Sequence, residues 1–209
     1  MLEKIFPLSS KIRINADYGK LENFSQEHVK FYLKYSSFVF RALKKPVFQK
    51  FLQWMLKKEK IEEQTVRAVH IKVLPFRRKN GKGVAGKCDT SRGRIRIYPK
   101  TLKFCQVFKQ KFGRNSFLFY AGNRARAALI HELLHLKYSA DEKTVRELAQ
   151  DYFFSFTQKQ PAQSSKSLTI YKIIFNAKVS GNKALPSGST RVKREVRAEL
   201  NMLKSKGRL

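Results

Sequence analysis

Apolar side chains recur at helical spacing in the first part of the chain and predict two helices there. Ser25 is a suitable N-cap residue for the first helix, and the apolar positions continue at helical spacing to about Leu43. Pro46 fits the first turn of the second helix, PVFQKFLQWMLKK, because the N–H that proline lacks would have no partner at that position. We therefore expect an N-terminal helical region over residues 1–64.

Between residues 66 and 97 the spacing shortens to a period of two, which is typical of strands. Val69, Ile71 and Val73 alternate with polar residues and predict one strand. After a glycine-containing turn, RRKNGKG, the segment VAGKC predicts a short second strand. RGRIRIYP predicts a third strand, with isoleucines on one face and arginines on the other.

Helical spacing returns from about Phe117 to Tyr138 and again from about Asp141 to Phe156. Beyond these helices, QKQPAQSSKS has the composition of a linker, TIYKIIFNA predicts another strand, and RVKREVRAELNMLK predicts a basic amphipathic helix. The order of elements favours an α/β (α+β) fold in which a small mixed sheet packs on the two central helices. We expect one folded core over residues 65–157 and a basic, partly flexible C-terminal tail over residues 158–209.

The charge of the chain is strongly positive, since 45 Lys and Arg against 15 Asp and Glu give a formal net charge of +30. Residues 72–114 hold fourteen basic side chains and one acid, whereas residues 121–155 are neutral. A sustained positive field predicts a polyanionic partner, with nucleic acid ahead of an anionic membrane. The alternative is a solvated basic face without a partner, and the sequence does not separate DNA from RNA. The candidate nucleic-acid-binding residues are Arg77, Arg78, Lys79, Lys82, Arg92, Arg94 and Arg96.

The cysteine content and the distribution of apolar residues indicate the cellular compartment in which the protein is expected. Cys88 and Cys105 are too few for a disulfide framework and lack the spacing of a zinc ribbon, which favours a reducing environment. The N-terminal sequence has no apolar run followed by a small-residue cleavage site, and no stretch has the roughly 20 apolar residues that a membrane span needs. We therefore expect a soluble, cytoplasmic protein with no membrane span.

The segment His131-Glu132-Leu133-Leu134-His135 is an HExxH motif. On a helix, residues four apart differ by about 40° in direction and about 6 Å along the axis, so both imidazoles can reach one ion. Neutral imidazole suits zinc, and Glu132 lies to the side, where it could accept a proton from zinc-activated water. The leucines of the motif lie on the opposite arc and can face the sheet. The alternative is a pair of ordinary surface histidines.

A catalytic zinc site needs three protein ligands, and no histidine follows His135. The third ligand of the expected single Zn²⁺ should therefore be a carboxylate of the following helix. Asp141 and Glu142 flank the apolar stripe of that helix, whereas Glu147 points away from it. Helical angles do not separate Asp141 from Glu142, and Glu142 has a further alternative as part of a capping box with Ser139.

The stretch HELLHLKYSADEKTVRELAQDYF resembles the active-site helix and the following glutamate helix of small gluzincin-type zinc metallopeptidases, including the soluble minigluzincins. The resemblance covers about Val66 to Phe156. It implies a zincin-like fold, Glu142 as the third zinc ligand, and a rim strand within GKGVAGKCDTSRGRIRIYP along which an extended substrate binds. Similarity to SprT-like proteases is weaker, because their downstream histidine and their zinc-ribbon cysteines have no counterpart here.

Three further side chains are candidates near the expected metal. Tyr138 lies on the histidine face of its helix and could donate a hydrogen bond to an oxyanion, with Tyr152 as a second candidate. The alternative for each is a tyrosine at the edge of the core with no catalytic role. Cys88 on the expected rim could bind the zinc as a thiolate, or it is an inert buried thiol.

Together these features predict a zinc metalloendopeptidase that hydrolyses peptide bonds of a protein or peptide substrate on or near nucleic acid. The rival interpretation is a basic nucleic-acid-binding protein whose HExxH motif holds a structural or vestigial metal. A peptidase would lose activity without Glu132, and a binding protein would not.

Overall fold

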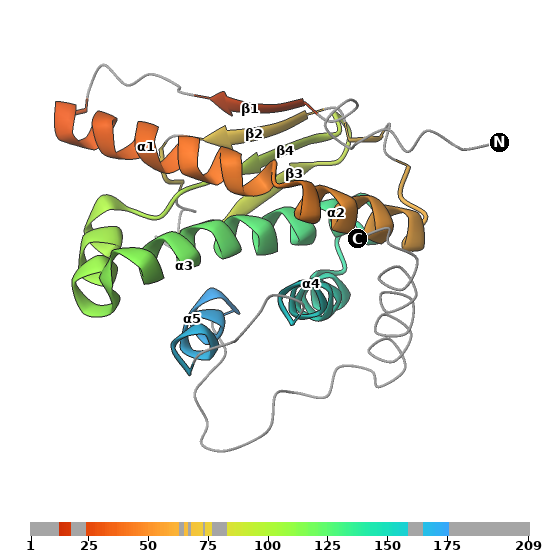
Figure 1. Cartoon of the computed structure of the whole chain (residues 1–209). Helices are drawn as coiled ribbons and strands as arrows, with labels where there is room; N and C mark the ends of the chain where they lie inside the picture. The colour runs from red at the N-terminus through yellow and green to blue at the C-terminus, as the bar shows by residue number, and fades with distance from the viewer. Residues whose placement is uncertain are drawn as a thin grey trace.

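The computed structural model describes residues 13–17, 24–62, 65–66, 68–72, 74–76, 83–158 and 165–175. This part of the chain is a mixed α/β structure with a small sheet and several helices (Figure 1). The elements in chain order are β1 (Arg13–Asp17), α1 (Gln26–Leu43), α2 (Pro46–Lys58), β2 (Ala68–Lys72), β3 (Gly86–Asp89), β4 (Arg94–Ile97), α3 (Leu102–Tyr138), α4 (Glu142–Thr157) and α5 (Ser165–Phe175).

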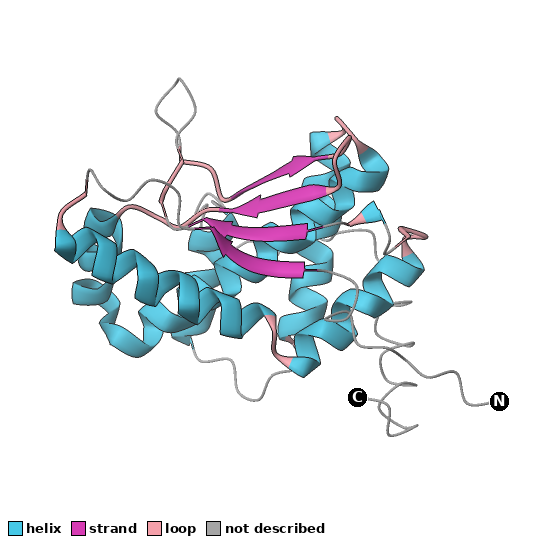
Figure 2. Ribbon diagram, turned by 90° about the horizontal axis from the view of Figure 1, so that it is seen from above, coloured by secondary structure: helices cyan, strands magenta, loops and turns pink. Residues whose placement is uncertain are grey.

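The sheet has the strand order β1-β2-β4-β3. β1, β2 and β4 run parallel, while β3 pairs antiparallel with β4 and forms an edge of the sheet. The alternation read from the sequence is present, because Val69 and Ile71 of β2 and Ile95 and Ile97 of β4 are all buried. Seen from above, the strands lie in front of the helices, so no described helix covers this face of the sheet (Figure 2). The residues that alternate with the buried valine and isoleucines lie on this uncovered face.

The helices form the layer beneath the sheet. α3 contacts both β3 and β4 on one side and α4 and α5 on the other, and α1 packs beside it (Figure 1). The core between these layers is apolar and well filled, with Leu43, Phe48, Ile95, Ile130 and Phe153 each 0% exposed. Among the described residues, no helix combines the length and the apolar character that crossing a bilayer requires.

α1, α2 and α4 confirm the helices expected from periodicity. Ser25 accepts a hydrogen bond from the N–H of His28 and caps α1, and proline occupies the first turn of α2. α3 begins much earlier than predicted, at Leu102, because Thr101 caps an additional amphipathic segment. The two parts of α3 meet at Gly113, whose φ of 83° and ψ of 167° break the helical geometry.

The strand predicted over TIYKIIFNA is wrong, because residues 165–175 form the helix α5. Its β-branched residues favour a strand by propensity, but helical spacing places Ile170 and Tyr171 together in the core. The Tyr171 ring contacts Phe153 of α4 and Phe119 of α3, with centroid distances of 5.6 Å in both pairs. The basic helix predicted nearer the C-terminus lies outside the described residues.

The strand β1 was missed by the sequence analysis, which expected only helices before residue 64. It pairs with β2 in the register Ile14↔Val69, and Ile14 is buried against the core. Asp17 at its end pairs with Lys72 of β2, so the first parallel pair is closed by an ion pair.

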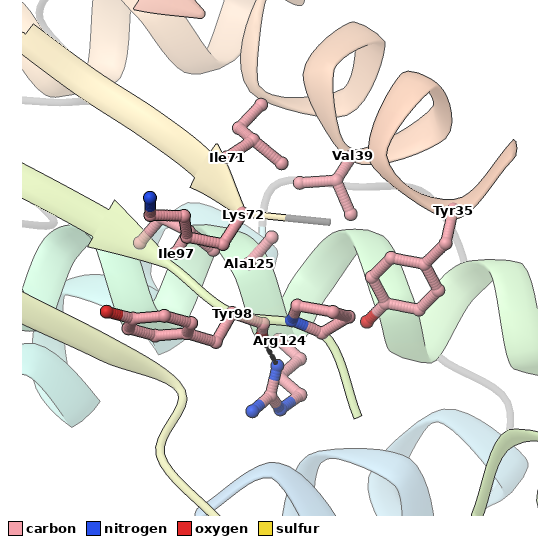
Figure 3. A pocket seen from close by; sticks show the side chains of 9 residues that line it. Tyr35, Val39, Ile71, Lys72, Ile97, Tyr98, Arg124 and Ala125 are labelled. Atoms are coloured by element: carbon pink, nitrogen blue, oxygen red, sulfur yellow. Dashed lines mark hydrogen bonds between the residues drawn. The ribbon is translucent and has the colours of Figure 1, made fainter. Parts of the chain in front are cut away.

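A buried arginine fixes the sheet over α3. Arg124 is 5% exposed, and its Nη1 donates to the carbonyl oxygen of Tyr98 at 2.5 Å, just after β4 (Figure 3). Its Nη2 donates to the carbonyl oxygen of Val84 at 3.3 Å, just before β3. Because β3 begins where the antiparallel β4 ends, both hydrogen bonds tie the same end of this strand pair to α3, two turns ahead of the HExxH motif.

Candidate metal centre

The two histidines of the HExxH motif lie one turn apart on α3 and point toward one place. The Nε2 atoms of His131 and His135 are 3.1 Å apart, and the ring planes are inclined at 82°. Oε2 of Glu142, the first residue of α4, lies 3.7 Å from Nε2 of His131 and 3.4 Å from Nε2 of His135. Within the described residues, these three side chains form a group that could hold a metal ion.

The spacing of the three ligand atoms fits zinc. A tetrahedral ion with metal–nitrogen distances of about 2.0–2.1 Å holds its ligand atoms about 3.3 Å apart. The three observed distances of 3.1, 3.4 and 3.7 Å bracket that value. Two imidazoles and one carboxylate are also a donor set that zinc accepts, and three protein ligands leave a fourth tetrahedral position open.

A tight turn between α3 and α4 brings Glu142 to the histidines. Ser139 at the end of α3 has a φ of 47°, which is uncommon for a residue with a side chain, and its N–H donates to the carbonyl oxygen of His135. Nδ1 of His135 donates to the carbonyl oxygen of Ser139 at 2.6 Å. Because a carbonyl oxygen can only accept, this bond places the proton on Nδ1 and leaves the Nε2 lone pair for a metal.

The Glu142 carboxylate is oriented by an arginine one turn along α4. Nη2 of Arg146 lies 3.0 Å from Oε1 of Glu142, so the other oxygen faces the histidines. Asp141, the other carboxylate considered from the sequence, is the N-cap of α4, and its Oδ1 accepts from the N–H of Thr144 at 3.1 Å. Because Asp141 holds the cap, the alternative capping box of Ser139 and Glu142 is not formed.

Glu132 is buried between α3 and the edge strand β3. Its side chain is 6% exposed, although the neighbouring His131 is partly open to solvent. A Cβ atom placed on Gly86 would lie 2.6 Å from Cγ and 2.7 Å from Oε1 of Glu132. The edge strand therefore approaches Glu132 at a distance that only glycine permits.

The surroundings of His131 favour its neutral form. Burial lowers the pKa of this imidazole, the charge of Glu142 raises it, and the charge of His135 lowers it, so the net direction is downward. A neutral imidazole is the form that binds a metal. On the opposite side of α3, Leu133 and Leu134 are fully buried, which holds the histidines toward the surface.

Tyr138, the candidate oxyanion donor, is hydrogen-bonded to another carboxylate. Its hydroxyl donates to Oε2 of Glu59 at 2.7 Å, and Lys137 lies 3.0 Å from the same oxygen. Tyr152 donates to the other oxygen of Glu59. Either tyrosine would have to leave Glu59 to reach an oxyanion. We call Glu59, Lys137, Tyr138 and Tyr152 the Glu59 cluster.

Glu59 itself is a buried carboxylate at the end of α2, with 7% of its surface exposed. Burial raises the pKa of this carboxyl, but the hydrogen bonds from Tyr152, Tyr138 and Lys137 outweigh burial, so the pKa is lowered overall. An ionised Glu59 therefore joins α2 to the end of α3 and to α4, the two helices that carry the three ligand candidates.

Cys88 lies on β3 with its side chain partly buried. Burial, followed by the charges of Glu132 and Asp89, raises the pKa of its thiol to about 12. The group is protonated at neutral pH, which favours the inert thiol over a zinc-binding thiolate.

The predicted nucleic-acid-binding residues fall in two groups. Arg94 is exposed and Arg96 is partly exposed on β4, where they alternate with the buried Ile95 and Ile97 and so lie on the sheet face that no described helix covers (Figure 2). Arg92 is exposed in the turn between β3 and β4. In the strand register Arg96 lies between Lys87 of β3 and His70 of β2. The other four, Arg77, Arg78, Lys79 and Lys82, lie outside the described residues.

Three residues at the site were missed by the sequence analysis. Arg146 could have been found, since a glutamate and an arginine four apart on a helix commonly pair. Gly86 and Glu59 carry no local pattern that points to the site, because both act through contacts between distant segments.

Comparison of the chain with protein-family models, with curated proteins and with solved structures finds no match. The gluzincin-type family therefore stays a prediction that depends on the motif and on the geometry described above.

Proposed function

We propose that the chain is a zinc metalloendopeptidase of the gluzincin type with a zincin-like core. His131, His135 and Glu142 would hold one zinc ion, and Glu132 would act as the general base. The observation that carries this proposal is the set of three ligand atoms 3.1 to 3.7 Å apart beside a buried glutamate and an edge strand. When bound, zinc would polarise the scissile carbonyl and make water a stronger nucleophile.

The edge strand β3 gives the proposal a place for the substrate. β3 pairs with β4 on one side only within the described part of the sheet, so an extended peptide can add to its other edge. Gly86 at the start of β3 lies against Glu132. A peptide that continues the sheet at this edge would run past Glu132 with its backbone held by hydrogen bonds.

Glu132 would move the proton that peptide hydrolysis requires. It would accept a proton from the attacking water and later deliver it to the leaving amine. Its burial against β3 restricts the carboxylate to a small region, which suits a group that must meet a water and an amine in turn. Tyr138 stays a candidate for oxyanion stabilisation, subject to its release from Glu59.

The test uses full-length protein loaded with zinc and mixed with several unrelated protein substrates. The wild type should cleave them, and Glu132→Gln should lower cleavage by about 10²- to 10⁴-fold while its zinc content stays at one ion per chain. Glu147→Gln, an exposed site on α4, is the matched control and should behave as the wild type. Equal cleavage by wild type and Glu132→Gln would refute the assigned base, and no cleavage by wild type would favour the rival below.

A second candidate function, nucleic-acid binding, is favoured by the charge of the uncovered sheet face. Burial lowers the pKa of His70 on this face, the charge of Asp17 raises it, and the charges of Lys72, Arg94 and Arg96 lower it, so that the net direction is downward. Three basic side chains, Lys72, Arg94 and Arg96, therefore act on this position together with one acid, Asp17. This function would either direct the peptidase to nucleic-acid-bound proteins or, with a structural or vestigial metal, replace it.

Its test is a DNA and RNA binding titration at two or more salt concentrations. The double substitution Arg92→Gln and Arg94→Gln should weaken binding and reduce the slope of log K against log salt by about 2, since each phosphate contact contributes close to one unit. Lys109→Gln with Lys111→Gln removes the same charge from exposed positions on α3 and is the control. Equal effects of the two pairs would show that net charge, and not the location of Arg92 and Arg94, determines binding.

A further inference from the structure

A cavity of about 440 Å³ lies between α1 and the middle of α3, away from the candidate metal centre. Its size falls within the range of sites for small molecules. Its apolar lining includes Phe38, Leu118 and Phe119, and its basic lining is Arg41, Lys45 and Arg126. No carboxylate is among the lining residues in the described part of the chain.

Arg126 is the unusual member of this lining, because it is a cation only 7% exposed. Its Nη1 donates to Oδ1 of Asn123 at 2.8 Å and its Nη2 to the carbonyl oxygen of Ala42 at 3.2 Å. Both acceptors are neutral, and Nε has no partner among the described residues. A buried arginine normally has a carboxylate or phosphate beside it, since isolated buried charge is strongly unfavourable.

The neighbours of Arg126 stabilise its charge only in part. The guanidinium lies 5.6 Å from the ring centre of Phe48 and 5.7 Å from that of Phe156, which are cation–π distances. Burial still lowers the pKa of Arg126, and within the described residues the opposing effect comes from Tyr171 and not from a carboxylate. The guanidinium therefore retains the capacity to pair with an anion.

The other residues that line the cavity indicate the chemical character of a ligand that would fit it. Arg41 and Lys45 are exposed and add positive charge where the cavity meets solvent, whereas Arg126 is at its buried part. Phe38, Leu118 and Phe119 supply apolar walls. An anion small enough to enter, with an apolar body, satisfies both kinds of lining.

We propose that this cavity binds a small amphiphilic anion, with a carboxylate or phosphate head paired to Arg126 and an apolar body against the phenylalanines. The site is independent of the proposed zinc centre, since none of its lining residues is a ligand candidate. Asn123 helps to hold the guanidinium in place through its side-chain oxygen.

The probe is octanoate, titrated calorimetrically into the full-length protein, with octanol and inorganic phosphate as comparison ligands. Octanoate should bind at least about tenfold more tightly than either, because only octanoate carries both the charge and the apolar body. Equal binding of octanol would show that charge is not recognised, and equal binding of phosphate would show that the apolar walls are not used. Either result would overturn the proposal.

Two variants locate the binding. Arg126→Met keeps the volume and removes the charge, and it should weaken octanoate binding about ten- to hundredfold, the range for a lost charge-assisted hydrogen bond. The exposed pair Arg41→Gln with Lys45→Gln should weaken it severalfold without disturbing the fold, which keeps the test valid if Arg126→Met unfolds. Lys109→Gln with Lys111→Gln is the charge-matched control. Unchanged binding in the Arg41 and Lys45 variant would exclude the cavity as the site.

Discussion

The two carboxylates at the junction of α3 and α4, Glu142 and Glu59, have opposite surroundings. Glu142 is half exposed, and it faces two imidazoles with one oxygen and an arginine with the other. Glu59 is buried and accepts hydrogen bonds from two tyrosines and a lysine. An open carboxylate beside histidines is suited to bind an ion, and a carboxylate saturated with donors is suited to fix the protein around it.

Both carboxylates nevertheless act on the same short segment. Tyr138 follows His135 by less than one turn, and Tyr152 lies on the same helix as Glu142. The Glu59 cluster thus anchors the two helices from which the ligand candidates project. The comparison predicts that loss of Glu142 affects metal affinity with little change in stability, and that loss of Glu59 does the reverse.

The largest expected effect is loss of zinc. His131→Ala or His135→Ala should weaken zinc binding more than about a hundredfold, because fewer than three protein ligands remain. Glu142→Ala should also weaken zinc binding. The free energy of unfolding of this variant without metal should stay within about 0.5 kcal/mol of the wild-type value. Zinc titration and urea unfolding measure the two quantities.

Glu147→Ala, exposed on the same helix, is the control for Glu142 and should retain zinc. Equal zinc retention by the Glu142 and Glu147 variants, or loss only in Asp141→Ala, would show that Glu142 is not the third zinc ligand.

The next effect is on stability. Glu59→Ala leaves two tyrosine hydroxyls and Lys137 without their shared acceptor, and it should lower the free energy of unfolding by about 2–4 kcal/mol. Glu59→Gln keeps one acceptor oxygen, so the free energy of unfolding should fall by less than in Glu59→Ala. Urea unfolding of the metal-free protein at pH 7 measures both, with Glu147→Ala as the reference for an exposed glutamate. A loss no greater than that of the reference would remove the cluster as an anchor.

Arg146 should have a smaller effect, because it contacts the proposed ligand Glu142 and is not itself a ligand candidate. Arg146→Ala should reduce zinc affinity by about tenfold or less, since its contact with Glu142 is exposed and partly screened. Lys143→Ala removes an exposed cation from the same helix and is the matched control. If both variants bind zinc alike, the effect of Arg146 is general electrostatics and not orientation.

The smallest effect is a change of stability with pH. The pKa of Glu59 is lowered in the folded protein, so its ionisation stabilises the fold above its ordinary pKa of 4.5. That contribution is lost as the pH falls through the lower, folded value. The stability difference between wild type and Glu59→Gln should therefore shrink below pH 4.5, measured by urea unfolding at several pH values. A difference that stays constant with pH would mean that the carboxyl titrates alike in both states.

The same comparison explains how much the sequence could predict. The two histidines and Glu142 lie within residues 131–142, and helical periodicity alone brings the histidines onto one face. Glu59 meets its partners across sequence separations of 78, 79 and 93 residues. Those contacts depend on how the end of α2 packs against α3 and α4, which no periodic pattern specifies.

The secondary-structure elements also separate into those that local spacing predicts and those that depend on contacts between distant segments. The helices α1, α2 and α4 and the strands β2, β3 and β4 followed from spacing and turn residues. The helix α5 did not, because its isoleucines and tyrosine are compatible with a strand until packing against Phe153 decides between the two. β1 is short, and its pairing with β2 joins segments 55 residues apart in the chain.

The close contact between Gly86 and Glu132 affects how the candidate site can change by mutation. Gly86 has no functional group, yet a single methyl at this position would coincide with the Glu132 side chain and force it to move. One nucleotide change converts a glycine codon to an alanine codon. A descendant gene could in this way keep all three proposed metal ligands while displacing the proposed base, Glu132. In a search for relatives with the proposed activity, the glycine on the edge strand should therefore be checked along with the histidines.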